Sequence, residues 1–187
     1  TFQGASAGNR ADSTILSLNA EFYNCLFDSH LALGGISGVS GLLFKDCRFI
    51  GTGAFGLNRT NSSSYPNIFI QDCFFSGEWN PHPNAVTTVS SIGIYKNCIF
   101  QDAYMPRFSG TLIDCLVVGN QNGPIIQVPN VSNATNIKLI RNTIINNHAT
   151  FPASVSGFGT STPTGIAIYN TSNKEITGSS NVATHYN

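Results

Sequence analysis

Charged residues are scarce in this sequence. Nine Lys and Arg residues and nine Asp and Glu residues make up 10% of its 187 positions, and the formal net charge is zero. An average globular protein has about 25% charged residues. A surface that binds nucleic acid needs clustered Lys and Arg, whereas the nine cations here are scattered singly along the chain. We therefore expect no nucleic-acid partner.

Long apolar runs are missing as well. No stretch approaches the roughly 18 consecutive apolar residues that a membrane span needs. The N-terminus also lacks the charged start and apolar stretch of a signal peptide. We expect a soluble chain in which residues 1–187 form a single domain, since a domain of this size buries about 70% of its unfolded surface. The abrupt opening at Thr1 indicates a fragment of a longer chain.

Patterns that bind metals are absent from the sequence. None of the four His residues stands at ligand spacing from the five Cys residues. Calcium-assisted lyase chemistry would need several carboxylates on one strand, and no segment carries such a group. We expect no metal and no cofactor.

A short phrase recurs instead. It reads "FYNCLF" at 22–27, "FKDCRF" at 44–49, "IQDCFF" at 70–75 and "YKNCIF" at 95–100, and it continues more weakly as "LIDCLV" at 112–117, "LIRNTII" at 139–145 and "AIYNTS" at 167–172. Successive copies are 22, 26, 25, 17, 28 and 28 residues apart. Such intervals are too short for independent domains and are typical of solenoid coils.

Aligned on this phrase, the sequence forms columns of like residues. The Asn or Asp column contains Asn24, Asp46, Asp72, Asn97, Asp114, Asn142 and Asn170. Two residues earlier stands an apolar column of Phe22, Phe44, Ile70, Tyr95, Leu112, Ile140 and Ile168, and three residues later stands another of Phe27, Phe49, Phe75, Phe100, Val117 and Ile145. The residues between them are mostly polar, so side chains alternate as strands require. We predict a strand, a tight corner at Asn or Asp and a second strand in every coil, with both apolar columns in the core.

Cysteine follows the corner in five copies, at Cys25, Cys47, Cys73, Cys98 and Cys115, and Thr143 and Thr171 replace it in the last two. Cysteine is small and commonly buried, so we expect reduced, structural thiols beneath the Phe column. Parallel Cβ vectors disfavour disulfides along the column. Partial disulfide pairing and metal binding stay open as alternatives. Reduced thiols indicate assembly in a reducing cytosol.

The recurring phrase, with its "YNCLF", "KDCRF", "QDCFF" and "KNCIF" copies, resembles the Asn-ladder corner of pectin-lyase-like right-handed parallel β-helices. The resemblance covers about residues 15 to 175 and implies an all-β solenoid of about seven coils. With its low charge, free cysteines and irregular coil lengths, the chain looks most like a phage tailspike or receptor-binding protein. That resemblance implies a homotrimer in the virion tail, assembled in the bacterial cytoplasm, which recognises bacterial surface polysaccharide. The tail "TGSSNVATHYN" loses the pattern, and we expect residues 177–187 to form a terminal cap.

Function should lie on outward positions or on the long connections between corners. "SGEWNPHPNAV" at 76–86 contains Glu78, Trp79 and His82, and "FQDAYMPRF" at 100–108 contains Asp102, Tyr104 and Arg107. Both segments leave the same corner, so Glu78 and Asp102 should lie on neighbouring coils with their backbones roughly 6 Å apart. A carboxylate pair at such a distance suits a glycosidase. Trp79, His82, Tyr104 and Arg107 are candidate carbohydrate contacts, because aromatic faces stack on sugar rings and Arg binds acidic groups.

Three functions therefore stay open. The first is a binding module for capsule or lipopolysaccharide, and the second is a polysaccharide-cleaving glycosidase or lyase that uses Glu78 and Asp102. The third is a structural shaft or a bacterial surface adhesin. The long connections allow the same residues to serve plain packing or a contact between subunits.

Overall fold

The structure is a computed structural model that describes residues 2–3, 20–28, 32–33, 41–50, 56–57, 67–76, 93–102, 108, 110–120, 125–127, 137–149, 153–158 and 165–178. Every regular element in these segments is a β-strand. A helix that could span a membrane does not occur in them. Of the predicted cap at 177–187, only the first two residues lie within the described segments.

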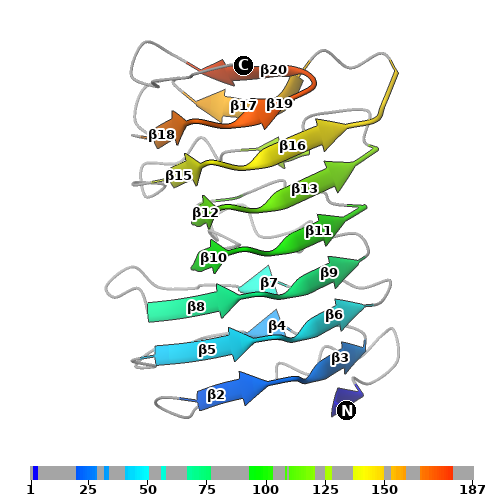
Figure 1. The fold of residues 1–187 in the computed structure, drawn as a ribbon, viewed down its shortest axis with the longest axis vertical. Helices are drawn as coiled ribbons and strands as arrows, with labels where there is room; N and C mark the ends of the chain where they lie inside the picture. Colours follow the sequence, from blue (N-terminus) through cyan, green and yellow to red (C-terminus); the bar gives the residue numbers. More distant parts are fainter. Residues whose placement is uncertain are drawn as a thin grey trace.

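Two large sheets dominate the fold (Figure 1). The seven-stranded sheet contains, in spatial order, β18 (Gly165–Ile168), β15 (Ile137–Ile140), β12 (Thr111–Ile113), β10 (Ile94–Lys96), β8 (Asn67–Gln71), β5 (Gly41–Lys45) and β2 (Ala20–Tyr23). The eight-stranded sheet contains β1 (Phe2–Gln3), β3 (Leu26–Asp28), β6 (Arg48–Ile50), β9 (Phe74–Ser76), β11 (Ile99–Gln101), β13 (Leu116–Gly119), β16 (Thr143–Asn146) and β19 (Thr171–Ser172).

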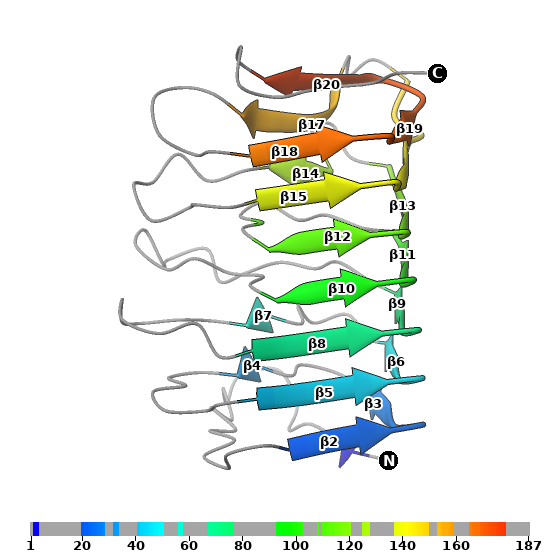
Figure 2. The ribbon, with the colours of Figure 1, turned by 60° about the vertical axis from the view of Figure 1, so that its left-hand side comes forward.

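Two smaller sheets lie behind these (Figure 2). One contains β14 (Ile126–Gln127), β17 (Ala153–Phe158) and β20 (Glu175–Gly178), and the other contains β4 (Ala32–Leu33) and β7 (Gly56–Leu57). All strand pairs in all four sheets are parallel. The prediction of an all-β chain of stacked parallel strands is confirmed, and the arrangement is consistent with a parallel β-helix.

Each strand of the seven-stranded sheet leads through two residues into a strand of the eight-stranded sheet, and we call this unit a layer. The first linking residue, the corner residue, has a left-handed backbone with φ between 51° and 55° in all seven layers. The second, the ladder residue, is buried in every layer except the first, where Cys25 is half-buried. A left-handed residue turns the chain sharply, so the two sheets meet at an edge.

The core is made of side chains stacked from layer to layer. Phe27, Phe49, Phe75 and Phe100 are stacked with ring centroids 4.7, 4.6 and 4.6 Å apart. Their file continues into Val117 and Ile144, both fully buried. These spacings follow from the inter-strand distance of about 4.8 Å, which places equivalent residues directly above one another. Regular stacking thus fills the space behind the corner.

The predicted alignment is wrong by one residue in the last two layers. Leu112 pairs with Leu139 and Val117 with Ile144, so Ile140 and Ile145 face outward and are only half-buried. The corner residues of these layers are accordingly Arg141 and Tyr169, whose φ angles are 51° and 55°.

Asn142 and Asn170 consequently occupy the ladder position, in file with the cysteines. On the outer side, Thr143 pairs with Leu116 and Thr171 pairs with Thr143. The shift keeps Leu139 and Ile144 in the core. Asn prefers the left-handed corner, but in these layers it lies one residue later. Burial of the aliphatic side chains and of the two amides therefore decides the register.

Candidate functional site

Most of the predicted site residues lie outside the described part of the chain. Glu78, Trp79, His82, Tyr104 and Arg107 all fall there. Asp102 is described, and it is an exposed residue with a left-handed backbone (φ 57°) directly after β11.

The pairing of β9 with β11 ends with Ser76 opposite Gln101, immediately before Asp102. This register places the starts of the two connections in neighbouring layers, as expected. The juxtaposition of the carboxylates of Glu78 and Asp102 stays a prediction.

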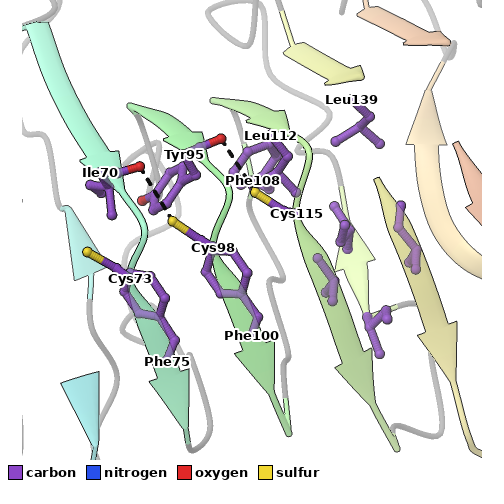
Figure 3. Close-up of a cluster of buried hydrophobic side chains, with 14 of the residues drawn as sticks. Ile70, Cys73, Phe75, Tyr95, Cys98, Phe100, Phe108, Leu112, Cys115 and Leu139 are labelled. Atoms are coloured by element: carbon purple, nitrogen blue, oxygen red, sulfur yellow. Dashed lines mark hydrogen bonds between the residues drawn. The ribbon is translucent and has the colours of Figure 1, made fainter. Parts of the chain in front are cut away.

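The ladder residues form one hydrogen-bonded file beneath the corner (Figure 3). The Cys98 Sγ donates to the Ile70 carbonyl at 3.4 Å, and the Cys115 Sγ donates to the Tyr95 carbonyl at 3.5 Å. Asn142 makes the equivalent bond from Nδ2 to the Leu112 carbonyl at 3.0 Å. Thiol and carboxamide therefore perform the same task, which is to donate to a core strand of the preceding layer.

Hydrogen bonds with the Cys98 thiol lower the pKa of Cys73 and Cys115, but every thiol except that of Cys25 is buried. Burial keeps a thiol from solvent. It raises the pKa of the Cys47 thiol from 9.0 to about 11. The pKa of Cys98 is raised as well, first by the neighbouring Cys115 and Cys73 thiols and then by burial. A reactive cysteine needs a lowered pKa and access to solvent. All five cysteines are free thiols, and among the described residues no three or more His, Cys, Asp or Glu side chains are grouped to hold a metal ion. The file is therefore scaffold.

A second set of hydrogen-bonded polar residues lies at the C-terminal ends of β16 and β19 in the last two layers. The Asn146 N–H donates to the Asn173 Oδ1 at 2.9 Å, and the Asn173 Nδ2 donates back to the Asn146 carbonyl at 3.1 Å. The His148 N–H donates to the Asn146 Oδ1 at 3.1 Å, and Lys174 Nζ donates to the His148 carbonyl. These bonds satisfy backbone groups at a second bend and so also have a structural role.

A polar cluster is fixed on the outer side of the corner. Asp72, the corner residue between β8 and β9, accepts at Oδ1 from Asn97 Nδ2 at 2.7 Å. It accepts at Oδ2 from Gln71 Nε2 at 2.9 Å. Asn97 is itself the corner residue of the next layer. Two carboxamides and a carboxylate are thereby held in a set arrangement at the molecular surface.

Exposed apolar side chains lie directly beside this cluster. Phe69 is 46% exposed and pairs with Ile94, which is 36% exposed. Phe69 precedes Gln71 by two residues on the same strand, so both side chains project from the same face, roughly 7 Å apart. We call Phe69, Gln71, Asp72, Ile94 and Asn97 the corner patch. It combines a flat apolar face with pre-positioned donors and acceptors.

An ion pair occupies the same edge further along the stack. Arg141 donates from Nε and Nη2 to both carboxylate oxygens of Asp114, each at 2.7 Å. The Arg141 guanidinium holds the pKa of Asp114 below its usual value. Both side chains are partly exposed, at 55% and 37%, and surface pairs of this kind contribute little to stability. At this edge the Asp72 carboxylate is therefore hydrogen-bonded by two amides, and the charges of Asp114 and Arg141 neutralise each other.

The corner patch was not predicted from the sequence, although a signal was present. In "NIFIQDC" the residues alternate, and the register that buries Ile70 turns Phe69 outward. Phe69 is adjacent to the exposed Ile94, and neighbouring exposed apolar residues of this kind mark a contact surface.

No family model, curated protein or solved structure was found to match this chain.

Proposed function

We propose that this chain is a right-handed parallel β-helix of about seven coils, acting as a homotrimer in a phage tailspike or receptor-binding protein, and that it binds bacterial surface polysaccharide. Each layer would then be one coil. In this proposal the long connections of the chain, with Glu78 and Asp102, are secondary to the lateral surface. Binding, rather than cleavage, is the function that the corner patch supports best.

One observation supports this function above the others, namely the exposed Phe69 ring next to the hydrogen-bonded Asp72, Asn97 and Gln71 side chains. A sugar ring has an apolar face of C–H groups and an equatorial rim of hydroxyls. The first suits an aromatic ring, and the second suits planar amides and carboxylates that both donate and accept. Because the polar groups already restrain one another, little side-chain entropy would be lost on binding.

The same surface disfavours a highly charged ligand. Asp72 has both oxygens engaged by amides, and Asp114 is paired with Arg141. In the described part of this edge, Lys45 and Lys96 flank Gln71 in the strand register and stand beside the carboxylates of the corner, so charges of both signs are mixed there. We therefore expect the glycan to be neutral or weakly charged where it crosses the corner patch.

Calorimetric titration with oligosaccharides prepared from the capsules and lipopolysaccharides of candidate hosts would test the proposal. We expect saturable binding that Phe69→Ala weakens at least tenfold, since the stacking surface is removed. Ile99→Ala is the matched control, because Ile99 is exposed to a similar extent (44%) but lies on the other sheet. Absence of binding across the panel, or equal binding by the Phe69→Ala variant, would contradict the proposed function.

A further inference from the structure

Among the residues whose side chains are described, the outer face of the eight-stranded sheet carries a single charge, and the register adds Asp28 beside Ile50 as a further outward position. Its outward side chains that the structure describes are Leu26, Arg48, Ile50, Phe74, Ser76, Ile99, Gln101, Leu116, Val118, Thr143, Ile145 and Thr171. Seven of these twelve are apolar, and Arg48 is the one charged member. Outward positions of a solvated sheet are ordinarily polar. This set, which we call the lateral face, is therefore a candidate contact surface.

The centre of the lateral face is its most apolar part. Ile99 is 44% exposed and lies between Phe74 and Leu116 in the strand register. The one cation does not stand away from the surface, because the Arg48 guanidinium lies over the Phe74 ring at 5.3 Å from its centroid. Such a cation–π contact lays the charged group along the sheet. A partner that covers the centre of this face, around Ile99, meets one cation, and that cation already contacts an aromatic ring.

The spacing of the layers limits which partner fits. Side chains on the lateral face repeat every ~4.8 Å along the stack. A partner whose side chains repeat at the same spacing can fit a row of side chains into the space between two rows in every layer. The surface of an ordinary globular protein has no such repeat and fits only a few layers. A second copy of this chain has the required repeat by construction. Since the formal net charge is zero, two copies also approach without long-range repulsion.

We propose that copies of this chain associate side by side, with aligned layers, through the lateral face. The inference deepens the proposed function by naming the surface of its oligomer, and it rests on that function only for the expectation that an oligomer exists. Each outward residue covers about 33 Å², one strand spacing by two residues, so the twelve residues cover about 400 Å² in each copy. A pair buries about 800 Å², which is below the range of tight complexes. We expect reversible association that strengthens with concentration.

Analytical ultracentrifugation from micromolar to submillimolar concentration tests the interface. The wild-type chain should show a mass that rises with concentration above that of the monomer. Ile99→Lys places a charge at the centre of the lateral face and should weaken association at least tenfold. Ile94→Lys is the matched control, because it makes the same substitution in the same layer on the outer face of the other sheet. That variant should associate like the wild type.

Three outcomes would overturn the interface. They are a monomeric mass at every concentration, equal weakening by the two Lys variants, and unchanged association of Ile99→Lys. Circular dichroism establishes that each variant is folded. Should Ile99→Lys fail to fold, Gln101→Lys replaces it, since Gln101 is already exposed and polar, and that variant should also weaken association.

The test separates this inference from the proposed function. Ile99→Lys should retain its affinity for a short oligosaccharide, whereas Phe69→Ala should lose that affinity and still associate. If the wild-type chain associates but binds no oligosaccharide, glycan binding at the corner patch fails and the lateral face stands. If it binds oligosaccharide but stays monomeric, the lateral face fails and glycan binding at the corner patch stands.

Discussion

The backbone N–H of Cys115 donates a hydrogen bond to the Oδ1 atom of Asn142, one layer further along the stack, at 2.9 Å. Earlier in the stack the N–H of Cys47 donates to the Cys73 Sγ in the same way, at 3.4 Å. The thiol and the carboxamide thus occupy equivalent positions in one file. The amide is the better partner, because sulfur accepts and donates hydrogen bonds only weakly.

The Asn142 carboxamide should be among the most sensitive positions of the fold. Asn142→Ala would remove the partner of the buried Cys115 N–H and one hydrogen bond to the Leu112 carbonyl. A buried group left unsatisfied costs about 1–3 kcal/mol, so we expect the free energy of unfolding to fall by about 2–4 kcal/mol in urea titrations. Thr143→Ala, next to it but exposed, should change stability by less than about 0.5 kcal/mol. Similar small effects of both variants would show that the file is not a stabilising ladder.

The sequence predicted the first five layers correctly and misplaced the last two. From Cys25 to Cys115 the corner Asn or Asp and the ladder Cys are chemically distinct, so the alignment has one solution. In the last two layers an Asn can occupy either the corner or the ladder position, so residue type alone does not decide which position it takes. The decision comes from packing, because only the shifted register buries Leu139 and Ile144.

The shift leaves Tyr169 in a left-handed conformation that suits Asn or Gly better. Tyr169 has φ 55° and is 67% exposed. Left-handed backbone costs roughly 1–2 kcal/mol for residues with a Cβ, and Asn tolerates it best among them. We expect Tyr169→Asn to raise the free energy of unfolding by about 0.5–1 kcal/mol in urea titrations.

The control for this change is Tyr23→Asn. Tyr23 is also exposed, at 48%, but it lies one residue before the corner and its φ is not positive. We expect no gain from it. A gain from both variants would assign the effect to loss of an exposed aromatic side chain rather than to the backbone.

The Asp114 carboxylate should titrate below an ordinary aspartate. Its two hydrogen bonds from Arg141 favour the charged form. Arg141→Gln removes the cation, so the pKa of Asp114 should rise toward its usual value in an NMR titration. Arg48→Gln, which removes a cation that contacts Phe74 instead, should leave it unchanged. The stabilisation from the pair is present above the ordinary Asp pKa and is lost as pH falls through the lowered one.

The candidate site was harder to predict than the fold. Strand alternation fixes which residues face outward, so Phe69 and Ile99 could be located from register alone. The long connections have no such periodicity. Register places their starts in neighbouring layers, but it does not set the distance between the carboxylates of Glu78 and Asp102. The prediction of a carboxylate pair therefore rests on the register of the backbone and on chemistry, and not on the positions of the carboxylates themselves.

That pair can be tested directly by product analysis. If the chain cleaves polysaccharide with Glu78 as one carboxylate and Asp102 as the other, incubation with capsule or lipopolysaccharide should release new reducing ends. Glu78→Gln and Asp102→Asn should each lower that rate at least a hundredfold, as loss of an acid or base does. Ser76→Ala, in the strand just before Glu78, is the control and should cleave like the wild type. Cleavage that both carboxylate variants retain excludes the pair as the catalytic residues.

The buried Cys47 thiol should make stability fall in alkali. The pKa of Cys47 is about 11 in the folded chain, against 9.0 for a thiol in water. Since the folded pKa is the higher one, the unfolded chain loses its proton first. The contribution of Cys47 is therefore fully present below about pH 9, declines as pH rises toward 11 and is lost beyond it. Two pH units correspond to about 2–3 kcal/mol.

Urea titrations of the wild type and Cys47→Ala at a series of pH values isolate this contribution. The variant should be less stable near neutrality, because it leaves a cavity and removes the bond from the thiol to the Phe22 carbonyl. Between pH 9 and 11, however, it should lose about 2–3 kcal/mol less than the wild type, so the two curves converge. Thr143→Ala, which titrates nothing, should run parallel to the wild type. If the plots of unfolding free energy against pH are parallel for Cys47→Ala and the wild type, the Cys47 thiol ionises as easily in the folded chain as in water. The ladder residues would then be accessible to solvent.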